Sequence, residues 1–192
     1  MKNSYLFFIA LALLMAACTS GRNPAVLIET ELGNIEAEIF VKKAPITAAN
    51  FMHHVATGTF NNGACFYRVV RMDNQPDNDV KIEVIQGGLY RNEGQSPPIA
   101  HETTRMTGIQ HTGGTLSMAR THPGSATTEF FICIGDQPEL DYQGKRNPDG
   151  QGFAAFGRVT KGMDVARKIQ QQNDSNQYLE NPVVIRSMKR IR

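Results

Sequence analysis

The stretch "ACFYRVV", residues 64–70, predicts a β-strand with a charged residue in its middle. Aromatic and β-branched residues dominate it, as is typical of strands. Because side chains alternate between the two faces of a strand, the pattern places Arg68 on the face of Phe66 and Val70. A cation on an apolar face has two interpretations. It is either a surface arginine on an edge strand or a functional group set against a hydrophobic floor.

The rest of the chain contains more strand-like runs than helical ones. Residues 26–40 alternate in the manner of a hairpin with a glycine turn, and further runs are found at 83–88, 114–120, 128–135, 153–160 and 181–191. Two segments, 44–58 and 162–171, show helical spacing of apolar residues. Within the first, His53 and His54 are adjacent, and we expect both to be solvated. Many short strands with two helices predict a β-barrel or sandwich whose open ends are covered by helices.

Length and charge limit the classes of function. The chain has 192 residues, of which 41% are hydrophobic, which is enough for one domain with its own core. Lysine and arginine number 20 and aspartate and glutamate number 18, so the charges nearly balance. This balance gives no electrostatic argument for nucleic acid as a partner, and we expect the protein not to bind nucleic acid.

The N-terminus has the pattern of a secretory signal peptide, predicted at residues 1–17. A cation at Lys2 precedes an apolar segment that is too short for a transmembrane helix, and small residues lead up to Cys18. The ending resembles a bacterial lipobox, so we expect Cys18 to be lipidated and residues 18–25 to form a tether. The alternative is ordinary cleavage nearby, which would leave a soluble periplasmic protein with a free thiol.

Common catalytic and metal-binding motifs are absent from the sequence. It contains no Gly-x-Ser-x-Gly, no His-Glu-x-x-His and no phosphate-binding glycine loop. The histidines at 101, 111 and 122 have no metal-ligand spacing, so we expect no metal and no cofactor. Cys65 and Cys133 lie in strand-like runs, where we expect buried free thiols rather than a disulfide.

Five strings in order resemble the cyclophilin-type peptidyl-prolyl isomerases. They are "FYRVV" (66–70), "VIQGG" (84–88), "GTLSMAR" (114–120), "SATTEFFICIGDQPELD" (125–141) and "FAAFGRVTKGMDV" (153–165). The resemblance runs from about residue 26 to the end, so one isomerase domain is expected over 26–192. It implies a mainly β fold: a closed eight-stranded antiparallel β-barrel capped by two α-helices. It also implies an active site on the outer surface of the barrel, which acts without metal or cofactor.

The same resemblance implies roles for individual residues. Arg68 matches the family's catalytic arginine, Gln86 matches a glutamine that helps to hold it, and Phe131 matches the floor of the proline pocket. We expect substrate contacts from Val84, Ala119, Arg120, Thr121, Glu129, Leu140 and Phe153. Arginine suits the catalytic role because its guanidinium is always charged and presents donors in a fixed fork.

Several positions depart from the family pattern. The pocket phenylalanine has no clear counterpart, with Glu83 nearest, and an acidic residue stands at 139 where an aromatic one is common. Val84 replaces a methionine and Glu129 a glutamine. Glu129 could hold Arg68 in place or compete with substrate for it. The loops at 71–83 and 143–152 could shape the site or bind a partner.

The leading hypothesis is therefore a monomeric isomerase, lipid-anchored in a bacterial cell envelope and facing the periplasm. Its partners would be proline-containing segments of exported polypeptides, whose folding it would assist, with the membrane contacted through the lipid. The alternative is a non-catalytic module that binds proline peptides or a partner on the same fold. A purely structural lipoprotein is a third interpretation.

Overall fold

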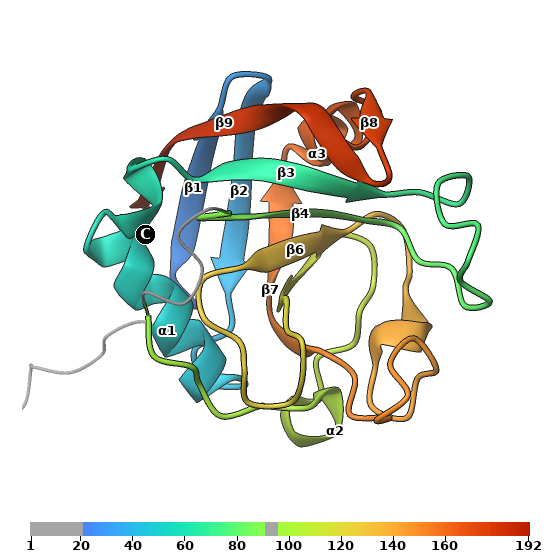
Figure 1. Ribbon diagram of the computed structural model, residues 1–192. Helices are drawn as coiled ribbons and strands as arrows, with labels where there is room; N and C mark the ends of the chain where they lie inside the picture. The colour runs from blue at the N-terminus through green and yellow to red at the C-terminus, as the bar shows by residue number, and fades with distance from the viewer. Residues whose placement is uncertain (1–20, 91–95) are drawn as a thin grey trace, which may run out of the picture.

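The computed structural model describes residues 21–90 and 96–192, which form an antiparallel β-barrel (Figure 1). Its strands are β1 (Ala25–Thr30), β2 (Gly33–Ile39), β3 (Cys65–Val70), β4 (Val84–Gly88), β5 (Thr115–Met118), β6 (Phe130–Cys133), β7 (Ala154–Lys161), β8 (Asp174–Ser175) and β9 (Tyr178–Arg190). Lipidation of Cys18 and cleavage of residues 1–17 lie outside the described residues.

Of the nine strands in residues 21–90 and 96–192, eight close the barrel. The order is β1-β2-β7-β5-β6-β4-β3-β9, and β9 pairs back onto β1. The two-residue β8 is an addition that pairs only with the start of β9 in the described part of the chain. The predicted closed eight-stranded antiparallel barrel is confirmed, and closure removes the exposed sheet edges that favour aggregation.

The strand that contains Arg68 has a β-bulge. Its pairing register shifts between Phe66 and Arg68 against both β4 and β9. A bulge inserts one extra residue and reverses the alternation beyond it. Phe66 and Val69 therefore pack in the barrel core, whereas Val70 belongs to a second cluster on the outside. The prediction that Arg68 shares a face with Phe66 is wrong, because simple alternation ignores the bulge at Tyr67.

Helices lie outside the barrel. The helix α1 (Pro45–Ala56) packs on β7 and β9, and α3 (Met163–Gln170) packs on β2, β3 and β4. In Figure 1, α1 is at the lower left of the barrel and α3 at the upper right. A third, one-turn helix, α2 (Thr104–Thr107), was not expected. Two 3₁₀ turns, η1 (Thr59–Asn61) and η2 (Pro138–Leu140), complete the elements. No helix in residues 21–90 and 96–192 has the length and apolar character needed to cross a membrane.

Apolar residues form two separate clusters. The larger one fills the barrel and includes Phe51, Phe66, Phe130 and Phe156, none more than 1% exposed. A filled interior leaves no lumen for a ligand. The smaller cluster contains Val70, Ile82, Val84, Phe131, Cys133 and Leu140, with Ala119 and Phe153 packed against it. It lies beyond the barrel wall and forms the apolar part of the site.

Two expectations about single residues have different outcomes. Cys65 and Cys133 are both buried and are not joined by a disulfide, as predicted, and burial raises the pKa of Cys133 well above its ordinary value. The expected solvation of His54 is wrong, because this residue is only 5% exposed and packs edge-on against Phe60. The helical stripe that buries Phe51 and Val55 also buries the intervening His54.

Candidate active site

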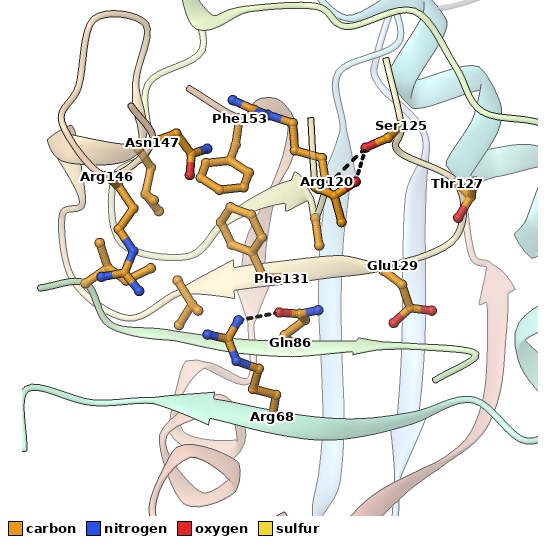
Figure 2. A pocket seen from close by; sticks show the side chains of 15 residues that line it. Arg68, Gln86, Arg120, Ser125, Thr127, Glu129, Phe131, Arg146, Asn147 and Phe153 are labelled. Carbon is orange, nitrogen blue, oxygen red and sulfur yellow. Dashed lines mark hydrogen bonds between the residues drawn. The ribbon is translucent and has the colours of Figure 1, made fainter. Parts of the chain in front are cut away.

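The three residues predicted to be catalytic lie in one row across neighbouring strands. Arg68 on β3 pairs with Gln86 on β4, and Gln86 pairs in turn with Phe131 on β6. Residues opposite each other in antiparallel strands project from the same face. Figure 2 shows the Phe131 ring with Arg68 and Gln86 below it and Phe153 above it. The register of the barrel thus brings together residues that are up to 63 positions apart (131 − 68).

These residues surround a cavity of about 330 Å³. All ten residues predicted for catalysis or substrate binding line it: Arg68, Val84, Gln86, Ala119, Arg120, Thr121, Glu129, Phe131, Leu140 and Phe153. Five others were not predicted: Ile82, Ser125, Thr127, Arg146 and Asn147. The volume suits a small side chain and its flanking backbone.

Arg68 is held by two glutamines. Its Nη1 donates to Gln86 Oε1 at 2.9 Å, while Nε and Nη2 both donate to Gln177 Oε1. Gln177 lies at the turn between β8 and β9, where it and Asn176 have φ values of 73° and 50°. Positive φ is costly for residues other than glycine and often occurs at functional sites. Burial lowers the pKa of Arg68, and the nearby Tyr178 and Tyr67 raise it in part. The guanidinium stays charged, because the pKa of arginine is very high.

Glu129 reaches Arg68 through a chain of hydrogen bonds. Tyr67 donates its hydroxyl to Glu129 Oε2 at 2.6 Å and accepts from Gln86 Nε2 at 2.7 Å. Gln86 in turn accepts from Arg68. The other oxygen of Glu129 accepts from the backbone N–H groups of Leu89 and Tyr90. Of the two roles considered for Glu129, this geometry fits indirect support of Arg68.

Gly88 makes this arrangement of Glu129 possible. Its φ is +148°, and a Cβ at this position would collide with the Glu129 carboxylate. Only glycine leaves the space that the carboxylate occupies next to the backbone of β4. The second glycine of "VIQGG" therefore has a packing function in the site.

The floor of the pocket is supported from behind by a histidine. The ring of His111 stacks on Phe131, with centroids 5.9 Å apart and an interplanar angle of 17°. Its Nδ1 lies 2.7 Å from Asp141 Oδ1 and its Nε2 lies 2.9 Å from Ser117 Oγ. This order resembles a Ser-His-Asp chain, but Ser117 is 0% exposed and lies beneath the floor. It cannot reach a substrate as a nucleophile, so the three groups fix the position of Phe131.

The apolar wall of the pocket is more complete than the sequence indicated. Ile82, which was not predicted, is 6% exposed and packs in the cluster with Val84 and Phe131. Glu83 does not line the cavity, and its carboxylate accepts from Gln170 Nε2 at 3.4 Å. An apolar side chain thus lines the pocket at Ile82, one residue before Glu83.

The loops 71–83 and 143–152 both contribute residues to the pocket. Arg146 in the second loop donates to Gln75 Oε1 at 3.1 Å and to the Val80 carbonyl in the first, so the loops are tied together. Arg120 donates to the Gly152 carbonyl and pairs with Asp149 at 2.8 Å. Its guanidinium is committed to the loop, which leaves the backbone around Arg120 as the part that could contact a substrate.

Several residues of the site were not predicted from the sequence, and for a common reason. Tyr67, Gln177, Ile82 and Arg146 reach the site through the bulge, through loops or through contacts distant in sequence. Only Gln177 had a local signal, because "SNQY" has an asparagine where a tight turn would need positive φ. Residues 91–95 lie outside the described part of the chain.

The chemistry available here is that of fixed donors beside an apolar surface. In residues 21–90 and 96–192, no three His, Cys, Asp or Glu side chains are placed together as metal ligands. The Cys133 thiol is 0% exposed, so it offers no accessible nucleophile. A guanidinium held beside an apolar floor can orient an amide and stabilise a distorted form of it.

Comparisons with known proteins agree with this geometry. The model of the family "Cyclophilin type peptidyl-prolyl cis-trans isomerase/CLD" matches residues 25–190. Peptidyl-prolyl cis-trans isomerase A of Dickeya dadantii is 37% identical over 177 residues, covering 87% of this chain and 84% of the relative. The isomerase of Acinetobacter baylyi is 39% identical over 166 residues, with coverages of 84% and 79%.

Solved structures share the fold. A cyclophilin-type isomerase of Cryptosporidium parvum superimposes with a TM-score of 0.70 at 19% identity, covering 88% of this chain and 98% of that one. A second C. parvum structure, determined in the presence of the dipeptide Ala-Pro, gives a TM-score of 0.68 at 18% identity, with coverages of 88% and 99%. With the family match over residues 25–190, these findings show that the chain belongs to the cyclophilin-type peptidyl-prolyl cis-trans isomerases.

Proposed function

We propose that the cavity around Arg68 is the active site of this isomerase and that Arg68, Gln86 and Phe131 carry the reaction. The proline ring of a substrate rests on Phe131, with Ile82, Val84 and Leu140 excluding water around it. The peptide backbone runs past residues 119–121. The observation that carries the proposal is the placement of the Arg68 guanidinium, fixed by two glutamines, next to an apolar floor.

The reaction requires a planar amide to become twisted. Rotation about an X-Pro bond has a barrier of about 18–20 kcal/mol and takes tens to hundreds of seconds without a catalyst. In the twisted state the prolyl nitrogen becomes pyramidal, and its lone pair, which is delocalised into the carbonyl in the planar amide, becomes localised on the nitrogen. Arg68 donates to the prolyl residue and favours that state over the planar one, which is selective stabilisation of the transition state. Gln86 keeps the donor aimed, so little reorganisation is needed.

A protease-coupled cis/trans assay on a short X-Pro peptide tests the assignment. We expect Arg68→Ala to lower kcat/KM by about a hundredfold to a thousandfold, the range found when one preorganised donor is removed. Circular dichroism and thermal unfolding establish that the variant is folded. A folded Arg68→Ala protein with the wild-type rate would remove Arg68 from the mechanism.

We further propose that the enzyme acts on exported polypeptides from a lipid anchor at Cys18, with soluble periplasmic protein as the alternative. The support is in the sequence: Lys2, the short apolar segment, and the small residues before the cysteine. Cells expressing the chain are grown with labelled palmitate. Label in the wild type and none in Cys18→Ser supports the anchor, whereas an unlabelled wild type that is found in the soluble periplasmic fraction supports the alternative.

A non-catalytic binding module remains the competing function for the pocket. It is motivated by the departures from the family pattern at Glu83, Val84 and Glu139, and Ile82 supplies an apolar side chain in the cluster that contains Val84. Measuring peptide affinity together with the isomerisation rate separates the two functions. Affinity without rate enhancement would favour the binding module.

A further inference from the structure

A second arginine faces the same cavity as Arg68. Arg146 extends from the loop between η2 and β7, and both arginines line the pocket. Figure 2 shows Arg146 and Arg68 approaching the same end of the pocket, beside Phe131. Arg120, the third arginine of the lining, points elsewhere and stacks over Phe153 at 5.1 Å.

In the part of the chain that the structure describes, no ion pair balances the two arginines at this end of the pocket. Within residues 21–90 and 96–192, the ion pairs include Arg120 with Asp149 but none that involves Arg68 or Arg146. Among the described residues of the lining, the carboxylate is that of Glu129, and it is bound by Tyr67 and by two backbone N–H groups. Burial lowers the pKa of Arg146, and the nearby charge of Arg68 lowers it further. An anion entering here would relieve the repulsion between two half-buried cations.

In the described structure, Arg146 is fixed in position and still has N–H groups available as donors. Its Nη1 is fixed by Gln75 Oε1 and by the Val80 carbonyl. Among the described residues, its Nε and Nη2 donate no hydrogen bond. A guanidinium held by one nitrogen, with two others unused, is preorganised for a carboxylate, which accepts two parallel N–H···O bonds.

We propose that Arg146 makes the enzyme prefer substrates with an aspartate or glutamate next to the proline. The inference rests on the proposed proline pocket: with the ring on Phe131, a neighbouring side chain lies within reach of the Arg146 end. An acidic side chain gains a charge-assisted hydrogen bond there, and a basic one meets two cations. The loop 143–152 thus selects substrates as well as completing the pocket wall.

The test uses four peptides that differ only in charge beside the proline. One pair has either Glu or Gln directly before the proline, and the other pair has either Glu or Gln directly after it. At one of these positions, the wild-type enzyme is expected to favour Glu by roughly three- to twentyfold in kcat/KM. The difference should lie mainly in KM, because Arg146 binds a part of the substrate that does not change in the reaction.

Variants establish which residue causes the preference. Arg146→Gln should reduce the Glu/Gln ratio to about one, and Arg146→Lys should retain part of it because the charge remains. The ratio is taken within each variant, so a general loss of activity from a displaced loop cancels. Lys145→Gln is the matched control: it removes an exposed cation one residue away and should keep the wild-type ratio.

A Glu/Gln ratio near one in the wild type at both positions would overturn the proposal, as would a ratio that survives Arg146→Gln. If the wild type binds these peptides without isomerising them, the proposed function fails, and the same comparison is made on affinities by fluorescence titration. A Glu preference in affinity that depends on Arg146 would then still support this inference. Added salt should weaken the preference for Glu, because screening reduces attraction between charges.

Discussion

Gln86 lies opposite Arg68 in the β3–β4 ladder and accepts a hydrogen bond from its Nη1 at 2.9 Å. The same glutamine lies opposite Phe131 in the β4–β6 ladder. The donor and the apolar floor are therefore fixed relative to each other by the barrel wall itself. A site built on paired strands keeps its geometry more closely than one built on loops.

Glu129 should act as an acceptor that supports the site. In Glu129→Ala, the N–H groups of Leu89 and Tyr90 and the Tyr67 hydroxyl each lose a bond that is present in the wild type. We expect the free energy of unfolding to fall by about 1–3 kcal/mol, together with kcat/KM, since buried polar groups are costly to leave unpaired. Glu129→Gln keeps an acceptor and should stay within about threefold of the wild-type activity. Urea unfolding and the coupled assay measure both quantities, and an Ala variant matching the wild type in both would disprove this role.

Arg120 should act on the pocket through the loop 143–152. Arg120→Met keeps the apolar stem over Phe153 but loses the bonds to Gly152 and Asp149. We expect faster amide hydrogen exchange in residues 143–152 and a KM that rises more than kcat falls, because the loop lines the pocket. Asp149→Asn is the control, since it weakens only the more exposed ion pair and should change stability by less than about 1 kcal/mol. Unchanged exchange in Arg120→Met would contradict the account.

His54 should make the fold sensitive to mild acid. Both of its ring nitrogens are buried without a hydrogen-bond partner in the described structure, and burial lowers its pKa, with a further contribution from His53. The unfolded chain then binds a proton more readily than the folded one. The stability due to neutral His54 is full above the ordinary pKa of 6.5 and is lost as pH falls through the lower folded value.

His54→Leu should therefore flatten the dependence of unfolding free energy on pH between 7.5 and 5. It should also raise stability by about 1 kcal/mol at pH 7.5, because an unpaired polar group is replaced by an apolar one. His53→Leu, at the exposed neighbouring position, is the control and should keep most of the pH dependence. Thermal unfolding at several pH values measures this, and equal slopes in wild type and His54→Leu would exclude His54 as the cause.

Much of the fold could be predicted because its elements have clear local patterns. The alternating run at 26–40 became β1 and β2, and the helical spacing at 44–58 became α1. The elements that escaped prediction are too short to show a period: α2 has four residues and β8 has two. The face of Phe66 was mispredicted for a different reason, since the bulge depends on how β3 pairs with two other strands.

The residues of the site also fall into those that could be predicted from the sequence and those that could not. Arg68, Gln86 and Phe131 were predicted from strings of sequence, and the register places them in one row. Ile82 and Arg146 could not be predicted, because loop residues reach a site through tertiary contacts that leave no local pattern. The link from Glu129 to Arg68 could not be predicted from the sequence either, since it passes through Tyr67 and Gln86 on two different strands.

The central claim, that Arg68 catalyses rotation rather than merely binding the peptide, is tested most directly by cis/trans exchange of the bound substrate. NMR exchange spectroscopy on an X-Pro peptide saturated with enzyme reports that rate separately from affinity. We predict that Arg68→Ala retains peptide binding through Phe131 but slows on-enzyme exchange by about a hundredfold or more. A variant that binds the peptide and exchanges it at the wild-type rate would contradict the account.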